Sequence, residues 1–298
     1  MKNYILKLGN LDRRIIFLLI GLAVLIPLIN PNLIDLPLGE DRNTRVVYDS
    51  ISNLNTNDKV LISFAYGAST KPEVHPMAVG LLNHLFSKGV KVYIVSLWPE
   101  SPIMAEQAIS SVRNSNLFSI EDGIDYVMFD YKVGGFVVIK GIADNFRDIY
   151  QQDKNGKSIN DLPIMEGIYD VTDFDFVFDF SAGVPGNAEW VQYACDPKNV
   201  PLSSGCTSIM VTDAIPYVES GQLKGILAGM PGAAEYEKMV YDFMVNEQIN
   251  NNSFINPQGN IVKGKAYARM SAQSVAHLLM VLFIVIGNIA YYYSRKES

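Results

Sequence analysis

The side chains best suited to chemistry are a histidine and a glutamate that follow an apolar, strand-like run. His75 lies in the stretch KPEVHPM, two residues after Glu73. A histidine in a loop next to a carboxylate can act as a general base. His75 and Glu73 are therefore candidate catalytic residues, and the alternative, that His75 is solvated or packs against its neighbours, stays open.

A turn that occurs twice supplies further candidates. The sequence SAGVPGNAEW at residues 181–190 recurs as LAGMPGAAEY at residues 227–236. Glycines allow tight backbone paths, and exposed amides at a helix start can hold phosphate or carboxylate. The next-to-last residue of each copy is a glutamate in the first turn of a predicted helix, where it either faces the ligand or caps its own helix. The candidate ligand-binding residues are Gly183, Gly186, Gly229 and Gly232, and the candidate catalytic or capping residues are Glu189 and Glu235.

Two weaker signals lie elsewhere. Lys132, in DYKVGG, is placed to reach an anion. Asp179 and Ser181, in DFSAG, resemble the start of a DxSxS metal-binding loop, but Gly183 stands where that loop needs serine. The chain contains no GxGxxG, P-loop, GxSxG, HExxH or CxxC pattern. We therefore expect no metal and no cofactor, and the balance of the sequence favours a protein that is not an enzyme.

The two cysteines, Cys195 and Cys206, lie in the loop-like stretch CDPKNVPLSSGC. Outside the cytoplasm such a pair commonly oxidises, and closing a loop of about ten residues stabilises the fold by roughly 2–3 kcal/mol. The sequence predicts a disulfide between them. The alternative is two separate buried thiols.

The elements that must position these residues alternate regularly between strand-like and helix-like runs. Strands are expected at residues 59–66, 90–98, 125–129, 174–180, 207–212 and 223–227, most of them followed by a helix-like segment. This pattern predicts an α/β fold with a doubly wound, mostly parallel sheet of about six strands, of the flavodoxin or Rossmann type. Ligands bind such sheets beyond the carboxyl ends of the strands. That edge, where the loops after the strands meet, is the expected site.

Two apolar runs, at residues 15–29 and 275–293, flank this alternation. A helix needs about 20 apolar residues to cross the hydrocarbon core, and lysines and arginines gather on the cytoplasmic side. A cleaved signal peptide is the alternative for the first run, but no small-x-small cleavage site follows it. The predicted order is a cytoplasmic N-terminus (1–14), a transmembrane helix with an interfacial linker (15–36), an extracytoplasmic domain (37–265), a second transmembrane helix (271–293) and a cytoplasmic C-terminus (294–298).

Charge and polar residues in the membrane run indicate the kind of partner. The formal net charge is −7; since residues 1–14 carry +3 and residues 294–298 carry +1, the remainder carries −11. An acidic domain disfavours nucleic acid as a partner. His277 and Asn288 lie in the second apolar run, where polar groups are costly and tend to face another helix. The expected partners are the lipid bilayer and further copies of the chain or other membrane subunits.

These observations favour a binding or assembly (scaffold) subunit of an oligomeric membrane complex. One alternative is a membrane-bound hydrolase or transferase that acts on a small anionic substrate at the edge of the sheet. Another is an accessory subunit of a transporter. An enzyme needs His75 within hydrogen-bond reach of a carboxylate and beside a pocket, so the geometry of this edge separates the first two readings.

Overall fold

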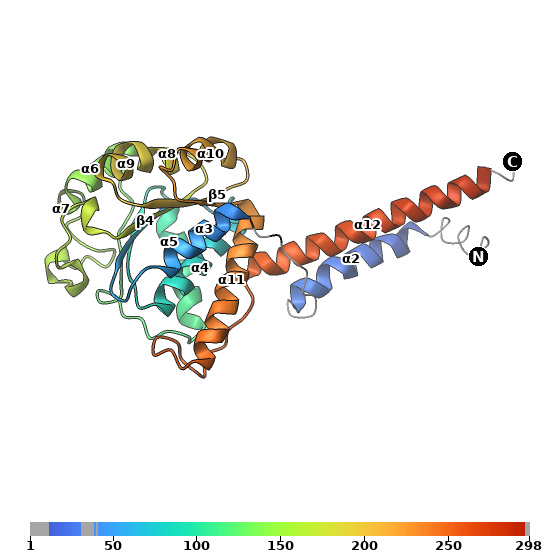
Figure 1. Ribbon diagram of the computed structural model, residues 1–298, viewed down its shortest axis with the longest axis horizontal. Coiled ribbons are helices and arrows are strands. Elements are labelled where there is room, and N and C mark those ends of the chain that lie inside the picture. Colours follow the sequence, from blue (N-terminus) through green and yellow to red (C-terminus); the bar gives the residue numbers. More distant parts are fainter. Residues whose placement is uncertain (1–11, 31–38, 40, 296–298) are drawn as a thin grey trace. The chain divides into compact units, whose positions relative to one another are not determined.

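The computed structural model of the protein describes residues 12–30, 39 and 41–295 (Figure 1). The chain divides into two compact units. One is the α/β domain, Leu38–Ala266, and the other joins Met1–Pro37 with Tyr267–Ser298. The terminal tails 1–11 and 296–298 and most of the linker expected after the first apolar run, residues 31–38, lie outside the described residues.

Within the described residues, the domain is built on one sheet of six strands in the order β3-β2-β1-β4-β5-β6, and every neighbouring pair is parallel. The expected α/β fold with about six strands is confirmed, and the sheet is entirely rather than mostly parallel. The order reverses between β1 and β4, which makes this pair the switch point at which ligands usually bind. The strands are β1 (Lys59–Ala65), β2 (Lys91–Ser96), β3 (Tyr126–Met128), β4 (Phe176–Ser181), β5 (Leu202–Cys206) and β6 (Ile226–Ala228).

The prediction for the fifth strand was wrong. The strand was expected at residues 207–212, which form a turn and the start of a helix, whereas β5 is Leu202–Cys206. The small residues of β5 fit a crowded place in the sheet: a Cβ on Gly205 would lie 2.9 Å from Met77 Sδ and from the ring of Phe180. Burial in the sheet thus outweighs the higher strand propensity of the sequence TSIMVT.

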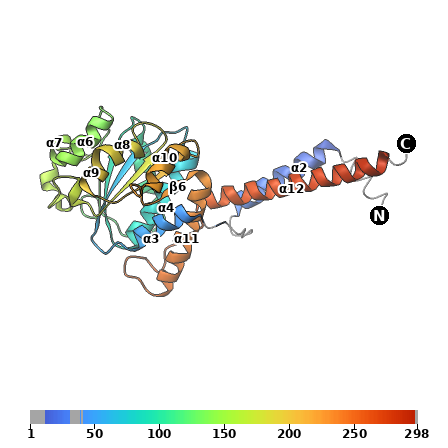
Figure 2. The same cartoon turned by 45° about the horizontal axis from the view of Figure 1, so that its top comes forward.

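Helices cover both faces of the sheet (Figures 1 and 2). Side chains alternate along each buried strand, so that Ile62 and Phe64 face one layer while Leu61 and Ala65 face the other. The first layer contains α3 (Arg42–Ser52), α4 (Lys71–Ser87), α5 (Ser101–Asn114) and α11 (Gly229–Ile249). The second contains α6 (Phe136–Asp144), α7 (Phe146–Ile149), α8 (Asn187–Trp190), the π-helical turn η4 (Val191–Cys195), α9 (Asp196–Lys198) and α10 (Val211–Glu219), with the 3-10 turns η1 (Ile159–Asp161), η2 (Pro163–Met165) and η3 (Val171–Asp173).

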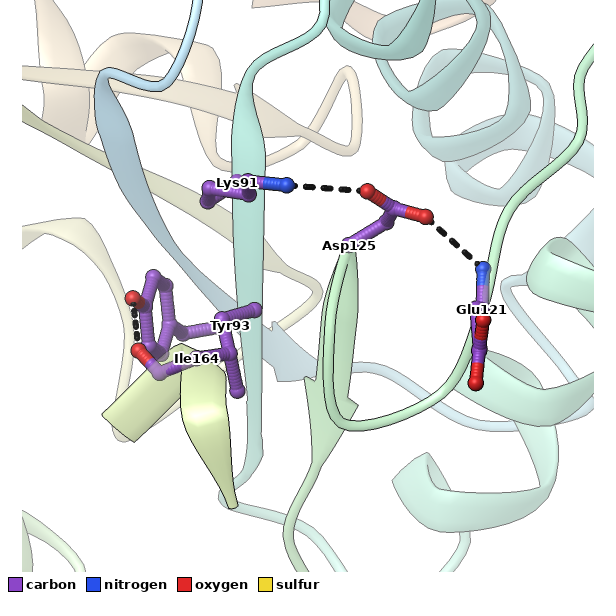
Figure 3. Close-up of polar contacts among 5 residues, drawn as sticks. All are labelled: Lys91, Tyr93, Glu121, Asp125 and Ile164. Carbon is purple, nitrogen blue, oxygen red and sulfur yellow. Dashed lines mark hydrogen bonds and ion pairs between the residues drawn. The ribbon is translucent and has the colours of Figure 1, made fainter. Parts of the chain in front are cut away.

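Polar contacts fix the amino-terminal edge of β2 and β3, opposite the expected site (Figure 3). Lys91 Nζ lies 2.9 Å from Asp125 Oδ1, and Asp125 Oδ2 accepts a hydrogen bond from the Glu121 amide at 2.9 Å. The buried Tyr93 hydroxyl donates to the Ile164 carbonyl at 2.5 Å. These contacts join β2 to the loop before β3 and to the segment after α7. They lie at the opposite end of the strands from the expected site.

The unit outside the domain contains α2 (Arg13–Ile29) and most of α12 (Lys265–Arg295). Among the described residues, Lys265–Tyr292 is a helix long and apolar enough to cross a membrane by length and composition, and 11% of its most apolar window is buried. This is weak evidence for a single membrane anchor. α2 has 17 residues, fewer than the about 20 that usually span a bilayer. The N-terminal span is therefore not shown.

Candidate functional site

The switch point lies between the loop after β1 and the loop after β4. The first loop runs from Tyr66 to Thr70 and leads into α4, and the second runs from Ala182 to Gly186 and leads into α8. The loop after β5 lies beside them because β5 pairs with β4. A ligand of the kind that α/β sheets commonly bind would contact the backbone amides of these loops.

In the described part of the chain, a glutamate accepts a hydrogen bond from an amide in each of these three loops. Glu100 accepts from the Ala68 amide after β1, and Glu189 accepts from the Gly186 amide after β4, both at 2.7 Å. Glu73 accepts from the Ser208 amide after β5, also at 2.7 Å. These carboxylates place negative charge where a bound phosphate or carboxylate would need positive potential. The loops therefore satisfy these amides internally.

The two catalytic candidates of the KPEVHPM stretch have separate partners. Glu73 reaches across to Ser208, whose hydroxyl also donates to Glu73 Oε1. His75 is buried, and its Nδ1 shares a hydrogen bond of 2.9 Å with the Tyr66 hydroxyl. Burial raises the pKa of Tyr66 well above its usual value, so this hydroxyl stays protonated at neutral pH. His75 is thus packed against a neutral phenol beneath the loop after β1.

The two copies of the repeated turn adopt different structures. In the first copy, Glu189 caps the start of α8, as the capping alternative expected. Gly183 and Gly186 make room for neighbours, since a Cβ on either would lie 2.9 Å from a side-chain atom of Trp98 or Ser181 respectively. The Trp98 indole, which comes from the loop after β2, donates to the Val184 carbonyl at 3.1 Å. The first copy is therefore a tightly packed loop.

In the second copy the helix begins directly after the strand. α11 starts at Gly229, whose φ of +58° favours glycine, and Gly232 lies inside the helix against the backbone of Leu227. Glu235 lies farther along α11 and accepts a hydrogen bond from the Asp41 amide at 3.0 Å, just before α3. The structure therefore brings Glu189 to the switch point and places Glu235 between α3 and α11.

Lys132 lies after β3, the strand at one end of the sheet. Its Nζ lies 5.7 Å from the ring centroid of Tyr150, in a cation–π contact. Because β2 lies between β3 and β1 in the sheet, the loop that carries Lys132 is not next to the loops of the switch point.

The expected disulfide is absent, because Cys195 and Cys206 are both free thiols. The stretch between them is not one exposed loop: η4 and α9 carry Cys195 and the residues after it, and β5 ends at Cys206. Both cysteines lie in the hydrophobic core. Burial raises the pKa of both thiols, to about 12 for Cys206, with Asp179 adding to the effect. They remain protonated and therefore poorly nucleophilic.

A buried polar row crosses the sheet at the switch point. Ser63 of β1 pairs with Asp179 of β4, and Asp179 pairs with Ser204 of β5. Ser181 follows two residues later on the same face of β4. All four side chains have 0% exposure. Asp179 is a single acid inside the apolar run FVFDFS, and this pattern is the sequence signal for a buried polar group.

The pKa of the Asp179 carboxyl is raised towards neutral pH. Burial raises its pKa from 3.8 to about 7, while the nearby hydroxyls of Ser181, Ser63 and Ser204 oppose the change and Glu189 adds to it. None of the three hydroxyls makes a hydrogen bond of regular geometry with the carboxyl group in this conformation. Their proximity therefore stabilises the charge only partly, and Asp179 can gain or lose a proton near pH 7.

Comparison of the chain with protein-family models, curated proteins and solved structures found no match. Among the described residues, no group of three or more histidines, cysteines, aspartates and glutamates is arranged to hold a metal ion.

Proposed function

We propose that the protein is a membrane-anchored α/β domain that acts as a binding or assembly (scaffold) subunit of an oligomeric membrane complex. One observation carries the proposal: the loops at the switch point use the chain's own glutamates, Glu73, Glu100 and Glu189, as partners for their amides. A domain that binds a small anion at this edge would instead leave such amides open to it. This arrangement disfavours the hydrolase or transferase alternative.

Exposed aliphatic side chains lie on the same loops. Val184, after β4, is 77% exposed, and Ile209, after β5, is 88% exposed. The two loops lie side by side because β4 pairs with β5, and contiguous exposed apolar surface is typical of protein–protein contacts. The loops after β4 and β5 are therefore the proposed contact surface, and we refer to it as the Val184–Ile209 surface.

A second copy of the chain is the proposed partner at this surface. A membrane anchor confines copies to one plane with restricted orientations, which raises their effective concentration for one another. α12 adds a polar feature, because His277 is exposed on the apolar helix. In hydrocarbon such a group favours contact with another helix. The proposed orientation keeps both termini in the cytoplasm and the domain outside, with α2 as a second span.

The test is the mass of the full-length protein in nanodiscs, measured by light scattering. The wild-type protein is expected to give a defined closed oligomer, and Val184→Asp with Ile209→Asp to shift it towards monomer. Ile249→Asp is the matched control, since Ile249 is 71% exposed at the far end of α11. A wild-type monomer, or equal loss of assembly in the control, contradicts the proposal.

A further inference from the structure

The turn after α11 carries a sequence that can accept a saccharide. Residues 251–253 read Asn-Asn-Ser, the only Asn-x-Ser/Thr sequence in the chain. In this pattern the first asparagine accepts an oligosaccharide when the segment lies at the surface of a protein outside the cytoplasm. Since the pattern also arises by chance, the structure of the turn decides whether Asn251 is a usable acceptor.

The backbone at Asn251 forms a tight turn directly after the helix. The C-cap of α11 is Asn250, and Asn251 follows with a φ of +58°. This left-handed conformation favours asparagine or glycine and ends the helix. The Asn251 N–H donates to the Gln248 carbonyl at 3.2 Å. The turn therefore depends on the backbone of Asn251 and not on its side chain.

The middle residue of the sequence anchors the turn to the domain. Asn252 Nδ2 donates to Glu247 Oε2 at 2.8 Å and to the Ser87 carbonyl at 3.3 Å. Asn251 and Ser253, on either side of it, are exposed, and their side chains have no hydrogen-bond partner among the described residues. The amide and the hydroxyl that the sequence pattern requires are thus both open to solvent.

We propose that Asn251 is a site of N-linked glycosylation. A membrane-bound transferase supplies the reaction with a lipid-linked oligosaccharide. The side-chain nitrogen of Asn251 forms a bond to the anomeric carbon of the sugar, while the bond from that carbon to the lipid phosphate breaks. The lipid phosphate leaves with the electron pair, and the amide nitrogen gives up one proton to a base. The folded domain accommodates the bulky product, because the exposed Asn251 side chain makes no contact that the sugar would displace.

The site lies at the opposite end of α11 from the proposed contact surface. α11 begins at Gly229, directly after β6, and ends at Ile249 (Figure 1). Its 21 residues span about 30 Å at 1.5 Å for each residue. The loop after it packs against Gly89, which precedes the start of β2. A saccharide on Asn251 therefore leaves the Val184–Ile209 surface free and keeps the amino-terminal edge of the sheet in water.

The inference rests on the proposed function in one respect, the extracytoplasmic position of the α/β domain. The test is cell-free translation of the full-length chain with microsomes, which supply the transferase and the lipid-linked donor. Mass spectrometry of the tryptic peptide 239–263, with fragmentation, shows whether a saccharide is attached and to which residue. Chains that are protected from protease by the vesicles are expected to carry it on Asn251.

Four variants separate the acceptor chemistry from folding. Asn251→Gly keeps the left-handed turn, because glycine also favours it, and should abolish the modification. Ser253→Ala leaves the asparagine in place and should also abolish it, whereas Ser253→Thr keeps the hydroxyl and should retain it. Asn250→Gln, at an exposed neighbour outside the sequence pattern, should match wild type. A saccharide that persists in Asn251→Gly, or is lost in Asn250→Gln, contradicts the assignment.

Protease protection distinguishes failure of this inference from failure of the proposed topology. If protease added outside the vesicles degrades the α/β domain, both are overturned. If the domain is protected and peptide 239–263 is unmodified in wild type and in Ser253→Thr, only the glycosylation is overturned. Asn251→Gly should also leave the number of subunits in the oligomer unchanged, and a change would contradict the placement of this turn away from the contact surface.

Discussion

Replacing Asp179 by asparagine should change how the stability of the domain depends on pH. The pKa of Asp179 is about 7 in the folded protein, whereas the ordinary pKa of an aspartate, which applies to the unfolded chain, is 3.8. Below pH 4 the carboxyl is protonated in both states. As pH rises from about 4 to 7 it ionises in the unfolded chain while it stays neutral in the folded one, so the folded state loses stability. Above pH 7 the full cost of the buried charge remains.

The size of the effect follows from these two pKa values. At 1.36 kcal/mol for each pH unit, the interval from 3.8 to about 7 corresponds to about 4 kcal/mol of unfolding free energy. Asparagine is neutral throughout. The difference in unfolding free energy between Asp179→Asn and wild type should therefore grow by about 4 kcal/mol from pH 4 to pH 8. For a domain of this size that corresponds to a rise of about 10 °C in the melting temperature of the variant relative to wild type.

The comparison must be between variant and wild type because His84 acts in the opposite direction. Burial lowers the pKa of His84 to about 3, so its contribution to stability is present above about pH 6.5 and is lost as pH falls towards 3. In the wild-type profile the two groups partly cancel. Subtracting the profiles of Asp179→Asn and wild type removes the contribution of His84.

The assay is thermal unfolding of the full-length protein in detergent at pH 4 to 8, followed by the fluorescence of Trp98 and Trp190. Asp161→Asn is the matched control, because Asp161 is exposed in η1. The control should not reproduce the growth of this difference with pH. A constant difference between Asp179→Asn and wild type across this range would refute the assignment of a neutral buried Asp179.

Three further predictions concern the two thiols, the Glu73–Ser208 contact and the membrane topology. Both Cys195 and Cys206 should be alkylated on denaturation without reductant, and intact mass would show two added groups; a loss of two mass units with no alkylation would indicate a disulfide. Glu73→Ala should lower the unfolding free energy by about 1–2 kcal/mol through loss of the charged acceptor for Ser208, while Glu106→Ala, at an exposed position on α5, should change it much less. In sealed, right-side-out vesicles, protease should cleave the α/β domain and spare tags on both termini; cleavage of either tag contradicts the proposed topology.

The alternation of apolar strands and helix-like runs was enough to predict the fold class. Long buried strands such as Lys59–Ala65 are apolar on both faces, and this is typical of a parallel sheet covered on both sides. The fifth strand was misplaced because LSSGC reads as a loop from propensity alone. Its small residues are explained only by close neighbours such as Met77, which is 125 residues or more away in sequence.

The site was harder to predict because it depends on contacts between segments that are distant in sequence. The capping of Glu189 is local and was foreseen as an alternative, whereas the contact of Glu73 with Ser208 joins α4 to the loop after β5. The row that contains Asp179 needs the strand register, which no sequence pattern gives. The repeat suggested two equivalent turns, but α11 begins directly at Gly229 and leaves no loop there.

The most direct test of the central claim is the mass of the full-length protein extracted into nanodiscs, with and without Ile209→Asp. The scaffold proposal predicts a defined oligomer for wild type and a shift towards monomer for the variant, with no change for Ile249→Asp. A wild-type protein that is monomeric at all concentrations would contradict the claim that this domain serves assembly.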